Sequence, residues 1–129
     1  MMEVLSSRVL LRPADFERSR RFYVDVVGLR VYREFGSGDH RGVVLFTGGG
    51  FLELSGRAPE PAGEKLSLWW QVPDVDAEHE RLAAAGVEVV ERPVVKPWGL
   101  REARLLDPDG LLLVLVQVPE DHPLRRDVR

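Results

Sequence analysis

The feature of this chain that most constrains its fold is an internal repeat. Two glycines that end predicted helices, Gly28 and Gly86, lie 58 residues apart, and two glycines in predicted hairpins, Gly50 and Gly110, lie 60 residues apart. A repeat of this length indicates that one supersecondary unit occurs twice. The alternative is a single irregular α+β domain in which the spacing is a coincidence.

Each half of the chain is predicted to contain one helix with recognisable ends. Asp15 and Asp74 each follow a proline that stops a strand, and aspartate is a good helix N-cap. The first helix is predicted to end at Gly28 and the second at about Ala85, before Gly86. Glycine suits both ends because it readily takes the left-handed conformation that terminates a helix.

Short segments rich in apolar and β-branched residues surround these helices and predict eight strands. They are Ser7–Arg12, Leu29–Phe35, Val43–Phe46 and Phe51–Ser55 in the first half, and Leu66–Val72, Val87–Arg92, Leu100–Leu106 and Leu111–Val118 in the second. We therefore predict an α+β fold of two βαβββ modules, residues 1–60 and 61–119, which form a curved mixed sheet around a pocket. The polar tail, residues 120–129, is predicted to be solvated or loosely docked.

The composition excludes several classes of function. The chain of 129 residues has a formal net charge of -3, which argues against a nucleic-acid partner because such a partner requires a basic face. The absence of cysteine excludes disulfides, thiolate metal sites and a cysteine nucleophile. No apolar run reaches the roughly 18 residues of a membrane span, and the first residues lack the pattern of a signal peptide. We expect a cytoplasmic protein that binds neither nucleic acid nor membrane.

Three segments of the chain resemble the vicinal-oxygen-chelate superfamily, which includes glyoxalase I, ring-cleaving dioxygenases and bleomycin-resistance proteins. The segments are 12–29, which begins RPADFERSRRFY, 72–87, which begins VPDVD, and 97–110, which contains PWGLRE and ends DPDG. Together they extend the resemblance over about residues 7–118. The resemblance implies the two-module fold and a homodimer, in which the pocket forms within one chain or across two, but it implies no particular reaction.

The resemblance also implies where a metal would bind. Enzymes of this superfamily usually hold a divalent metal with His, Gln or Glu side chains from four strands, at positions that correspond here to Arg8, Glu53, Ser67 and Val114. Arginine has no lone pair to donate, serine is a poor neutral ligand, and valine cannot bind a metal. A hard cation needs several fixed donors, so a divalent metal is disfavoured at these positions. We therefore predict that the protein has no cofactor.

In place of a metal, we predict an ion pair between Arg8 and Glu53 inside the pocket. An arginine fork fits a carboxylate, whereas an isolated carboxylate in an apolar cavity is costly. The alternative is that both side chains reach solvent and never meet. Strand alternation supplies most of the other candidate ligand-binding residues. A further candidate is Trp98, the aromatic residue of the Pro-Trp-Gly loop. Trp69 could equally belong to the core. The predicted ligand-binding residues are Arg8, Arg12, Phe51, Glu53, Ser67, Trp69, Gln71, Trp98, Arg101 and Val114.

Three functions remain open at this point. The first is a metal-free binding protein of the bleomycin-resistance type that sequesters an antibiotic or an aromatic metabolite. The second is a lyase, isomerase or dioxygenase in which Glu53 is the general base and Arg8 or Arg12 holds a substrate anion. The third is a structural or regulatory dimer. A base paired with Arg8 would be a poor one because its charged form is already stabilised, so binding of a small molecule is favoured.

Overall fold

The computed structural model describes residues 1–124 of the chain. The backbone divides into two compact units, the first Met1–Pro61 and the second beginning at Ala62. This boundary lies next to the predicted one, after residue 60, in a segment without helix or strand. Each unit has its own four-stranded sheet, so the repeat in the sequence is a repeat in the structure, and the predicted α+β class with two βαβββ modules is confirmed.

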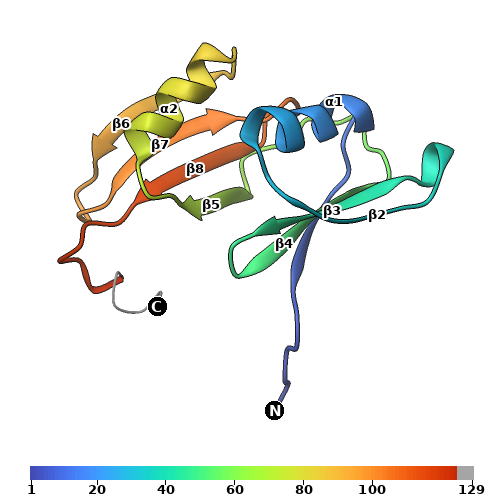
Figure 1. The fold of residues 1–129 in the computed structure, drawn as a ribbon, viewed down its shortest axis with the longest axis horizontal. Helices are drawn as coiled ribbons and strands as arrows, with labels where there is room; N and C mark the ends of the chain where they lie inside the picture. The colour runs from blue at the N-terminus through green and yellow to red at the C-terminus, as the bar shows by residue number, and fades with distance from the viewer. Residues whose placement is uncertain (125–129) are drawn as a thin grey trace. The chain divides into compact units, whose positions relative to one another are not determined.

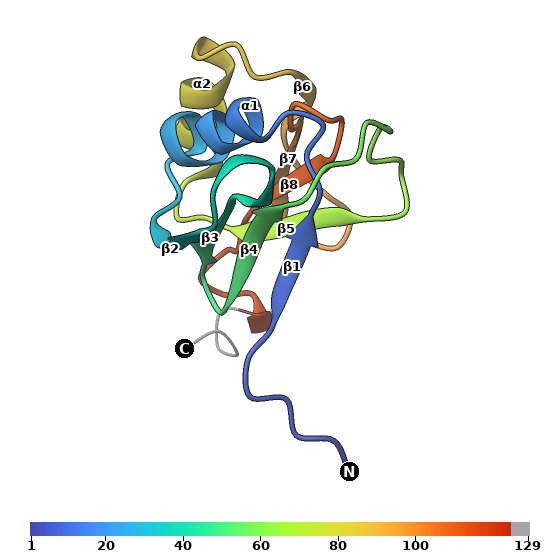
Figure 2. The same cartoon turned by 90° about the vertical axis from the view of Figure 1, so that its right-hand side faces the viewer.

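The first unit has one helical segment between its first and second strands. Its elements are β1 (Arg8–Leu11), α1 (Phe16–Arg20), the π-helix η1 (Arg21–Val27), β2 (Val31–Phe35), the 3₁₀ turn η2 (Gly38–His40), β3 (Gly42–Thr47) and β4 (Gly50–Ser55). The strand order is β1-β4-β3-β2, with β1 parallel to β4 and the other pairs antiparallel. The helical segment lies on one side of this sheet (Figure 1, Figure 2).

The second unit repeats this arrangement. Its elements are β5 (Ser67–Gln71), α2 (Val75–Ala84), β6 (Val89–Val95), β7 (Arg101–Leu106) and β8 (Leu112–Gln117). The strand order is β5-β8-β7-β6, and again only the pair formed by the first and last strands, β5 and β8, is parallel. In both units the first strand is therefore an edge strand of its sheet.

The helix ends follow the predicted residues. The side chains of Asp15 and Asp74 each accept a backbone N–H bond from the residue three positions later, at 3.1 Å in both cases. Gly28 and Gly86 take positive φ angles of 91° and 89°, which side chains with a Cβ rarely adopt. None of the helices in residues 1–124 is long and apolar enough to cross a membrane.

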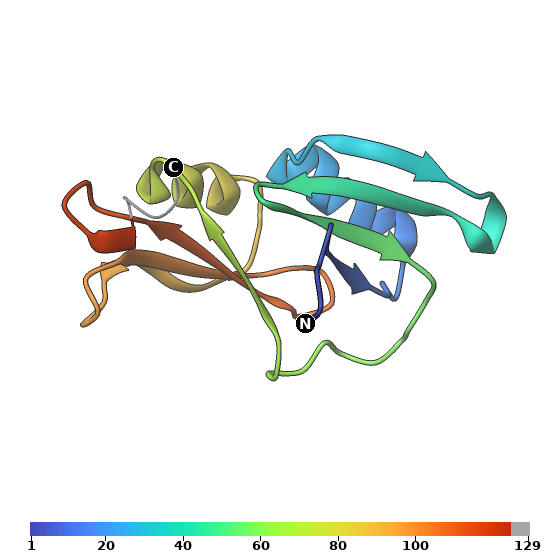
Figure 3. The ribbon, with the colours of Figure 1, turned by 90° about the horizontal axis from the view of Figure 1, so that it is seen from below.

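Alternation along the strands gives each sheet one face covered by its helix and one open face. In β4, Leu52 and Leu54 are buried, whereas Phe51 and Glu53 between them point to the other side. In the first unit, Figure 3 shows the helical segment behind the strands. The covered faces hold the cores, formed by Tyr23, Val43, Leu45, Leu52 and Leu54 in the first unit and by Leu68, Val75, Leu82, Ala103, Leu105, Leu113 and Leu115 in the second.

The structure differs from the prediction in the second half of the first helix. Only Phe16–Arg20 is α-helical, and Arg21–Val27 continues as a π-helix, which is rare and occurs mostly in single turns. Its widened end is visible in the backbone bonds, since the N–H groups of Gly28 and Leu29 both donate to Tyr23 O. Seven residues are too few for hydrophobic spacing to distinguish this winding from an α-helix.

The strand β6 lies further along the chain than predicted. The prediction was Val87–Arg92, but β6 runs from Val89 to Val95 and so includes Pro93. Proline lacks a backbone N–H and is tolerated in edge strands and at bulges. Both conditions apply here, because β6 is an edge strand and its register with β7 shifts between Glu91 and Val94.

The predicted polar tail is partly docked. Leu124 packs against an apolar cluster on the second unit, and His122 Nε2 lies 3.3 Å from the carbonyl oxygen of Trp98. This packing gives the start of the tail a fixed place, in contrast to a solvated end. The rest of the predicted tail, residues 125–129, lies outside the described residues.

Candidate functional site

The predicted ion pair between Arg8 and Glu53 forms on the open face of the first sheet. Because β1 and β4 are parallel neighbours, with Arg8 level with Phe51 and Leu10 level with Glu53, these side chains share one face. Arg8 Nη1 donates to Glu53 Oε1 at 2.8 Å. The pair is covered unequally, since the side chain of Glu53 is 15% exposed and that of Arg8 is 37% exposed.

The surroundings of Glu53 favour its ionised form. The hydroxyl of Ser55 donates to Glu53 Oε2 at 2.7 Å, and this bond lowers the pKa of Glu53 more than any other contact. Burial raises the pKa, but the hydrogen bond and charge of Arg8 and the charge of Arg33 lower it further, so that it lies below the usual value for glutamate. Glu53 is therefore a charged and weakly basic group at neutral pH.

An aromatic cluster lies beside this pair. The rings of Tyr32, Phe46 and Phe51 contact one another with centroids 5.0–5.6 Å apart, and the guanidinium carbon of Arg8 lies 5.9 Å from the Phe51 centroid. Phe51 was predicted, but Tyr32 and Phe46 were missed. The available signal for Phe46 was its place in the β3–β4 hairpin, which sets it level with Phe51 on the same face.

A second group of predicted residues lies together on the open face of the second sheet. Trp69 on β5 is level with Val114 on β8, and Ser67 and Gln71 lie on the same side of β5 by alternation. Trp69 is 47% exposed and so belongs to the surface of this face rather than to the core. Gln71 Oε1 is buried and accepts no hydrogen bond from any residue in the part of the chain described.

Val114 belongs to an apolar cluster on this face. Its buried members are Leu100, Val114, Val116 and Val118, and Leu112 and Leu124 pack against them. An apolar strip therefore follows β8, and the beginning of the C-terminal segment covers part of it.

Trp98 is held beside this strip by a buried carboxylate. Its indole Nε1–H donates to Glu102 Oε2 at 2.6 Å, and Glu102 is only 2% exposed. The ring itself remains 54% exposed. A half-exposed tryptophan whose polar atom is already bonded can offer its flat face to a ligand. Glu102 was not predicted, although its position four residues after Trp98 in the next strand was a usable signal.

Two predicted residues lie apart from these groups. Arg101 lies on the helix-covered side of β7, where its Nε and Nη2 donate to the two carboxylate oxygens of Asp76, both at 2.7 Å. This pairing raises the pKa of Arg101 and lowers that of Asp76. Arg12 follows the end of β1 and its aliphatic carbons approach Gly56. We leave Arg101 out of the candidate site because Trp69 and Trp98 lie on the other face.

The residues at the family's metal positions do not fit a metal. In the first unit, Arg8 occupies one position and donates to the carboxylate at the other. In the second unit, Val114 has no donor atom, and Ser67 alone offers a neutral oxygen. No group of three or more His, Cys, Asp or Glu residues suited to an ion occurs in residues 1–124. Among these four positions, the one carboxylate that could bind a cation is that of Glu53, and Arg8 already neutralises it.

A separate hollow of about 590 Å³ lies at another edge of the first unit. Its lining residues come from the turn after β1 and the start of α1, from the 3₁₀ turn and the residue after it, and from the segment after β4. They are Ala14, Asp15, Phe16, Gly38, Asp39, Arg41, Gly56 and Arg57. It contains none of the predicted site residues. Arg41 is already occupied there, since it lies 4.8 Å from the Phe16 ring centroid and pairs with Glu17, so we do not assign a function to this hollow.

Comparison with known proteins identifies the family. Residues 6–115 match the family model described as the Glyoxalase/Bleomycin resistance protein/Dioxygenase superfamily. The chain belongs to this superfamily. None of the curated proteins compared with the chain matches it.

Solved structures of the superfamily's fold agree with this assignment. TioX from Micromonospora sp. ML1 is 30% identical, with a TM-score of 0.71 and coverage of 88% of this chain and 98% of that chain. TnmS3 from Streptomyces sp. CB03234, described as an antibiotic binding protein, is 25% identical, with a TM-score of 0.73 and coverage of 92% and 99%. A superfamily member from Sphaerobacter thermophilus DSM 20745 has a TM-score of 0.76 over 91% and 99% of the two chains, but at 22% identity it supports the fold alone.

The Glu53 environment predicts a specific pH dependence of stability. Because the pKa of Glu53 is lowered in the folded protein, its ionised form contributes stability above the unfolded glutamate value of about 4.3, and this contribution is lost as the pH falls through the folded value. The free energy of unfolding of the wild type should exceed that of Glu53→Gln by a constant amount from neutral pH to about pH 5.5, and the gap should shrink below about pH 4.5.

Urea unfolding between pH 3.5 and 7 measures this gap. Ser55→Ala is the matched comparison, because it removes the contact that lowers the pKa of Glu53 most while leaving Arg8 in place. The free energy of unfolding of this variant should change less between pH 7 and pH 3.5 than that of the wild type. A gap that stays constant down to pH 3.5 would show that the carboxylate gains nothing from its folded surroundings.

Proposed function

We propose that this protein is a metal-independent binding protein for small aromatic molecules, of the bleomycin-resistance type. The observation that carries the proposal is the open face of the second sheet. There Trp69 on β5 is level with Val114 of the apolar strip, and Trp98 is bonded to Glu102 on β7, the strand on the other side of β8. Ligand sites in proteins are mostly apolar with a few placed polar groups, and half-exposed aromatic rings of this kind are suited to stacking on a flat molecule.

The relatives support this proposal. TnmS3 is described as an antibiotic binding protein and matches this chain over almost its whole length. Sequestration of an antibiotic or aromatic metabolite requires no catalyst, and so it agrees with a chain whose metal positions hold an arginine and a valine.

The alternative, a lyase or isomerase with Glu53 as general base, has less support. A general base works best when its pKa lies near the operating pH. The hydrogen bonds from Ser55 and Arg8 move the pKa of Glu53 in the opposite direction. Such an enzyme would first have to separate Glu53 from both partners.

The edge strand β1 supports a further part of the proposal, a homodimer. Leu10 is 61% exposed and Val9 is 36% exposed, and an edge strand with exposed apolar residues is a surface that proteins normally cover. We expect light scattering to give twice the chain mass of 14.6 kDa. A monomer mass at all concentrations tested would reject the homodimer without affecting the ligand site.

Ligand binding can be tested by the tryptophans themselves. Titration with a panel of neutral planar aromatic compounds should quench the intrinsic fluorescence with saturation. Trp69→Ala and Trp98→Ala should each weaken binding by about five- to tenfold, the expected contribution of one stacked ring. Trp70→Phe is the control, because Trp70 points to the opposite side of β5, and it should bind as the wild type does.

The outcomes separate the candidate functions. Saturable quenching that depends on Trp69 and Trp98 supports a binding protein. The absence of quenching by every compound in the panel would contradict the proposal and favour a structural or regulatory role.

A further inference from the structure

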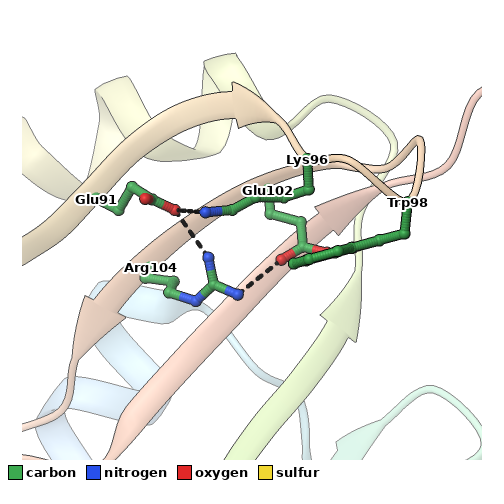
Figure 4. Close-up of polar contacts among 5 residues, drawn as sticks. All are labelled: Glu91, Lys96, Trp98, Glu102 and Arg104. Atoms are coloured by element: carbon green, nitrogen blue, oxygen red, sulfur yellow. Dashed lines mark hydrogen bonds and ion pairs between the residues drawn. The ribbon is translucent and has the colours of Figure 1, made fainter.

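A polar cluster covers the β6 and β7 side of the open face in the second unit. It consists of Glu91, Lys96, Trp98, Glu102 and Arg104, which come from two strands and the loop between them (Figure 4). Four of these residues were not predicted as site residues. The cluster lies next to the apolar strip, because Arg104 is level with Val114 across the β7–β8 pair.

Arg104 lies between two carboxylates within this cluster (Figure 4). Its Nη1 donates to Glu91 Oε1 at 2.8 Å and its Nη2 donates to Glu102 Oε1 at 3.0 Å. A guanidinium group is planar and its N–H groups lie in that plane. The two terminal nitrogens are therefore committed to protein carboxylates, whereas the faces of the plane make no hydrogen bonds.

The cluster is balanced in charge. Lys96 also pairs with Glu91, and the bonds from Lys96 and then Arg104 lower the pKa of Glu91, so that this carboxylate is charged at neutral pH. Glu102 accepts a second bond from Trp98. Two acids and two bases thus lie in mutual contact, and the cluster offers no uncompensated positive charge to an anion.

The position of Arg104 makes its plane relevant to a ligand. Across the open face, Trp69, Val114 and Arg104 form one row on β5, β8 and β7. The side chain of Arg104 is 24% exposed. A flat molecule that contacts Trp69 and the strip would also meet Arg104, and a cation above an aromatic ring attracts it through the ring quadrupole.

We infer that Arg104, held between Glu91 and Glu102, is a specificity-determining residue that selects planar aromatic ligands without an acidic group. This inference rests on the proposed function and names the ligand class of that site. Arginine commonly recognises carboxylates and phosphates by its fork of N–H groups. Here the protein's own carboxylates occupy that fork, so an acidic ligand must displace one of them, whereas a neutral ring can stack without breaking a bond.

Two dyes that differ by one acidic group test the inference. N-phenyl-1-naphthylamine is neutral, and 1-anilinonaphthalene-8-sulfonate has the same rings with a sulfonate added. The wild-type protein should bind the neutral dye more tightly. The double variant Glu91→Gln/Glu102→Gln keeps the shape of both side chains and frees the charge of Arg104, so its affinity for the sulfonate should rise about tenfold relative to the neutral dye.

Variants of Arg104 separate stacking from charge. Arg104→Lys retains a cation but loses the plane, and Arg104→Leu loses both. Each change should lower the affinity for the neutral dye by about two- to fivefold, which is the contribution expected of one partly exposed guanidinium stacked on a ring. Circular dichroism and urea unfolding establish that each variant is folded. If the double glutamine variant does not fold, the single change Glu91→Gln replaces it. This change removes only the more exposed carboxylate and should shift the dye preference in the same direction as the double variant.

The results distinguish this inference from the proposed function. Equal or tighter binding of the sulfonate by the wild type, or a dye preference unchanged in the glutamine variants, would overturn the assignment of Arg104 while leaving a binding protein intact. Binding of neither dye would count against both. A neutral-dye preference that reverses in the double variant would support the inference.

Discussion

The pairing of arginine with carboxylate on the open face of each sheet is the constraint on which the chemistry of these faces depends. In the first unit Arg8 donates to Glu53, and in the second unit Arg104 donates to both Glu91 and Glu102. Glu102 is almost fully buried, so removing Arg104 would leave a buried charge short of one partner, which is costly. Arg8 is substantially exposed, and surface pairs of this kind contribute only about 0–1 kcal/mol. We therefore regard the pairs as a means of neutralising the carboxylates on these faces, with Arg33 as a further cation near Glu53 in the first unit.

The pairing of these carboxylates with arginine has consequences for function. The helix-covered face of each sheet holds most of the apolar core and provides stability, whereas the half-exposed aromatic rings lie on the other face. On that face the first unit presents the rings of Tyr32, Phe46 and Phe51, and the second presents Trp69 and Trp98. Aromatic surfaces next to neutralised charges favour contact with flat apolar molecules. They do not favour coordination of a metal ion, for which lone pairs must be free. In the second unit they also do not favour capture of an anion, because both terminal nitrogens of Arg104 are bonded to carboxylates.

Much of this arrangement could be predicted from the sequence because it depends on local patterns. Strict alternation in Phe51–Ser55 predicts which side chains share a face with Glu53, and the repeated aspartates and glycines predict the helix ends. The Arg8–Glu53 pair was predictable because the resemblance placed both residues at neighbouring positions of the fold and their charges are opposite. The assignment to the superfamily rests on the order of several weak motifs, and the family match over residues 6–115 agrees with it.

The parts that could not be predicted depend on register and on the winding of helices. The shift in register between Glu91 and Val94 decides which β6 side chains meet Arg104, and no local pattern fixes such a shift. The side of β7 taken by Arg101 follows from the same strand alternation that directs Glu102 to the open face. To predict the ion pair between Arg101 and Asp76, one would also have to know where α2 lies. Tyr32 was missed for a related reason, because the register of β2 with β3 is also irregular.

The most direct test of this account is whether a divalent metal can compete with Arg8 for Glu53. Tag-free protein labelled with ¹³C at its glutamate carboxyl groups would be titrated with Mn²⁺, Ni²⁺ and Zn²⁺, with calorimetry in parallel, at neutral pH. The account predicts no stoichiometric binding and, for diamagnetic Zn²⁺, no shift of the Glu53 carboxyl resonance. Tight one-to-one binding of any of these metals that is lost in Glu53→Gln would contradict it, since the carboxylate would then be a ligand and its pairing with arginine dispensable.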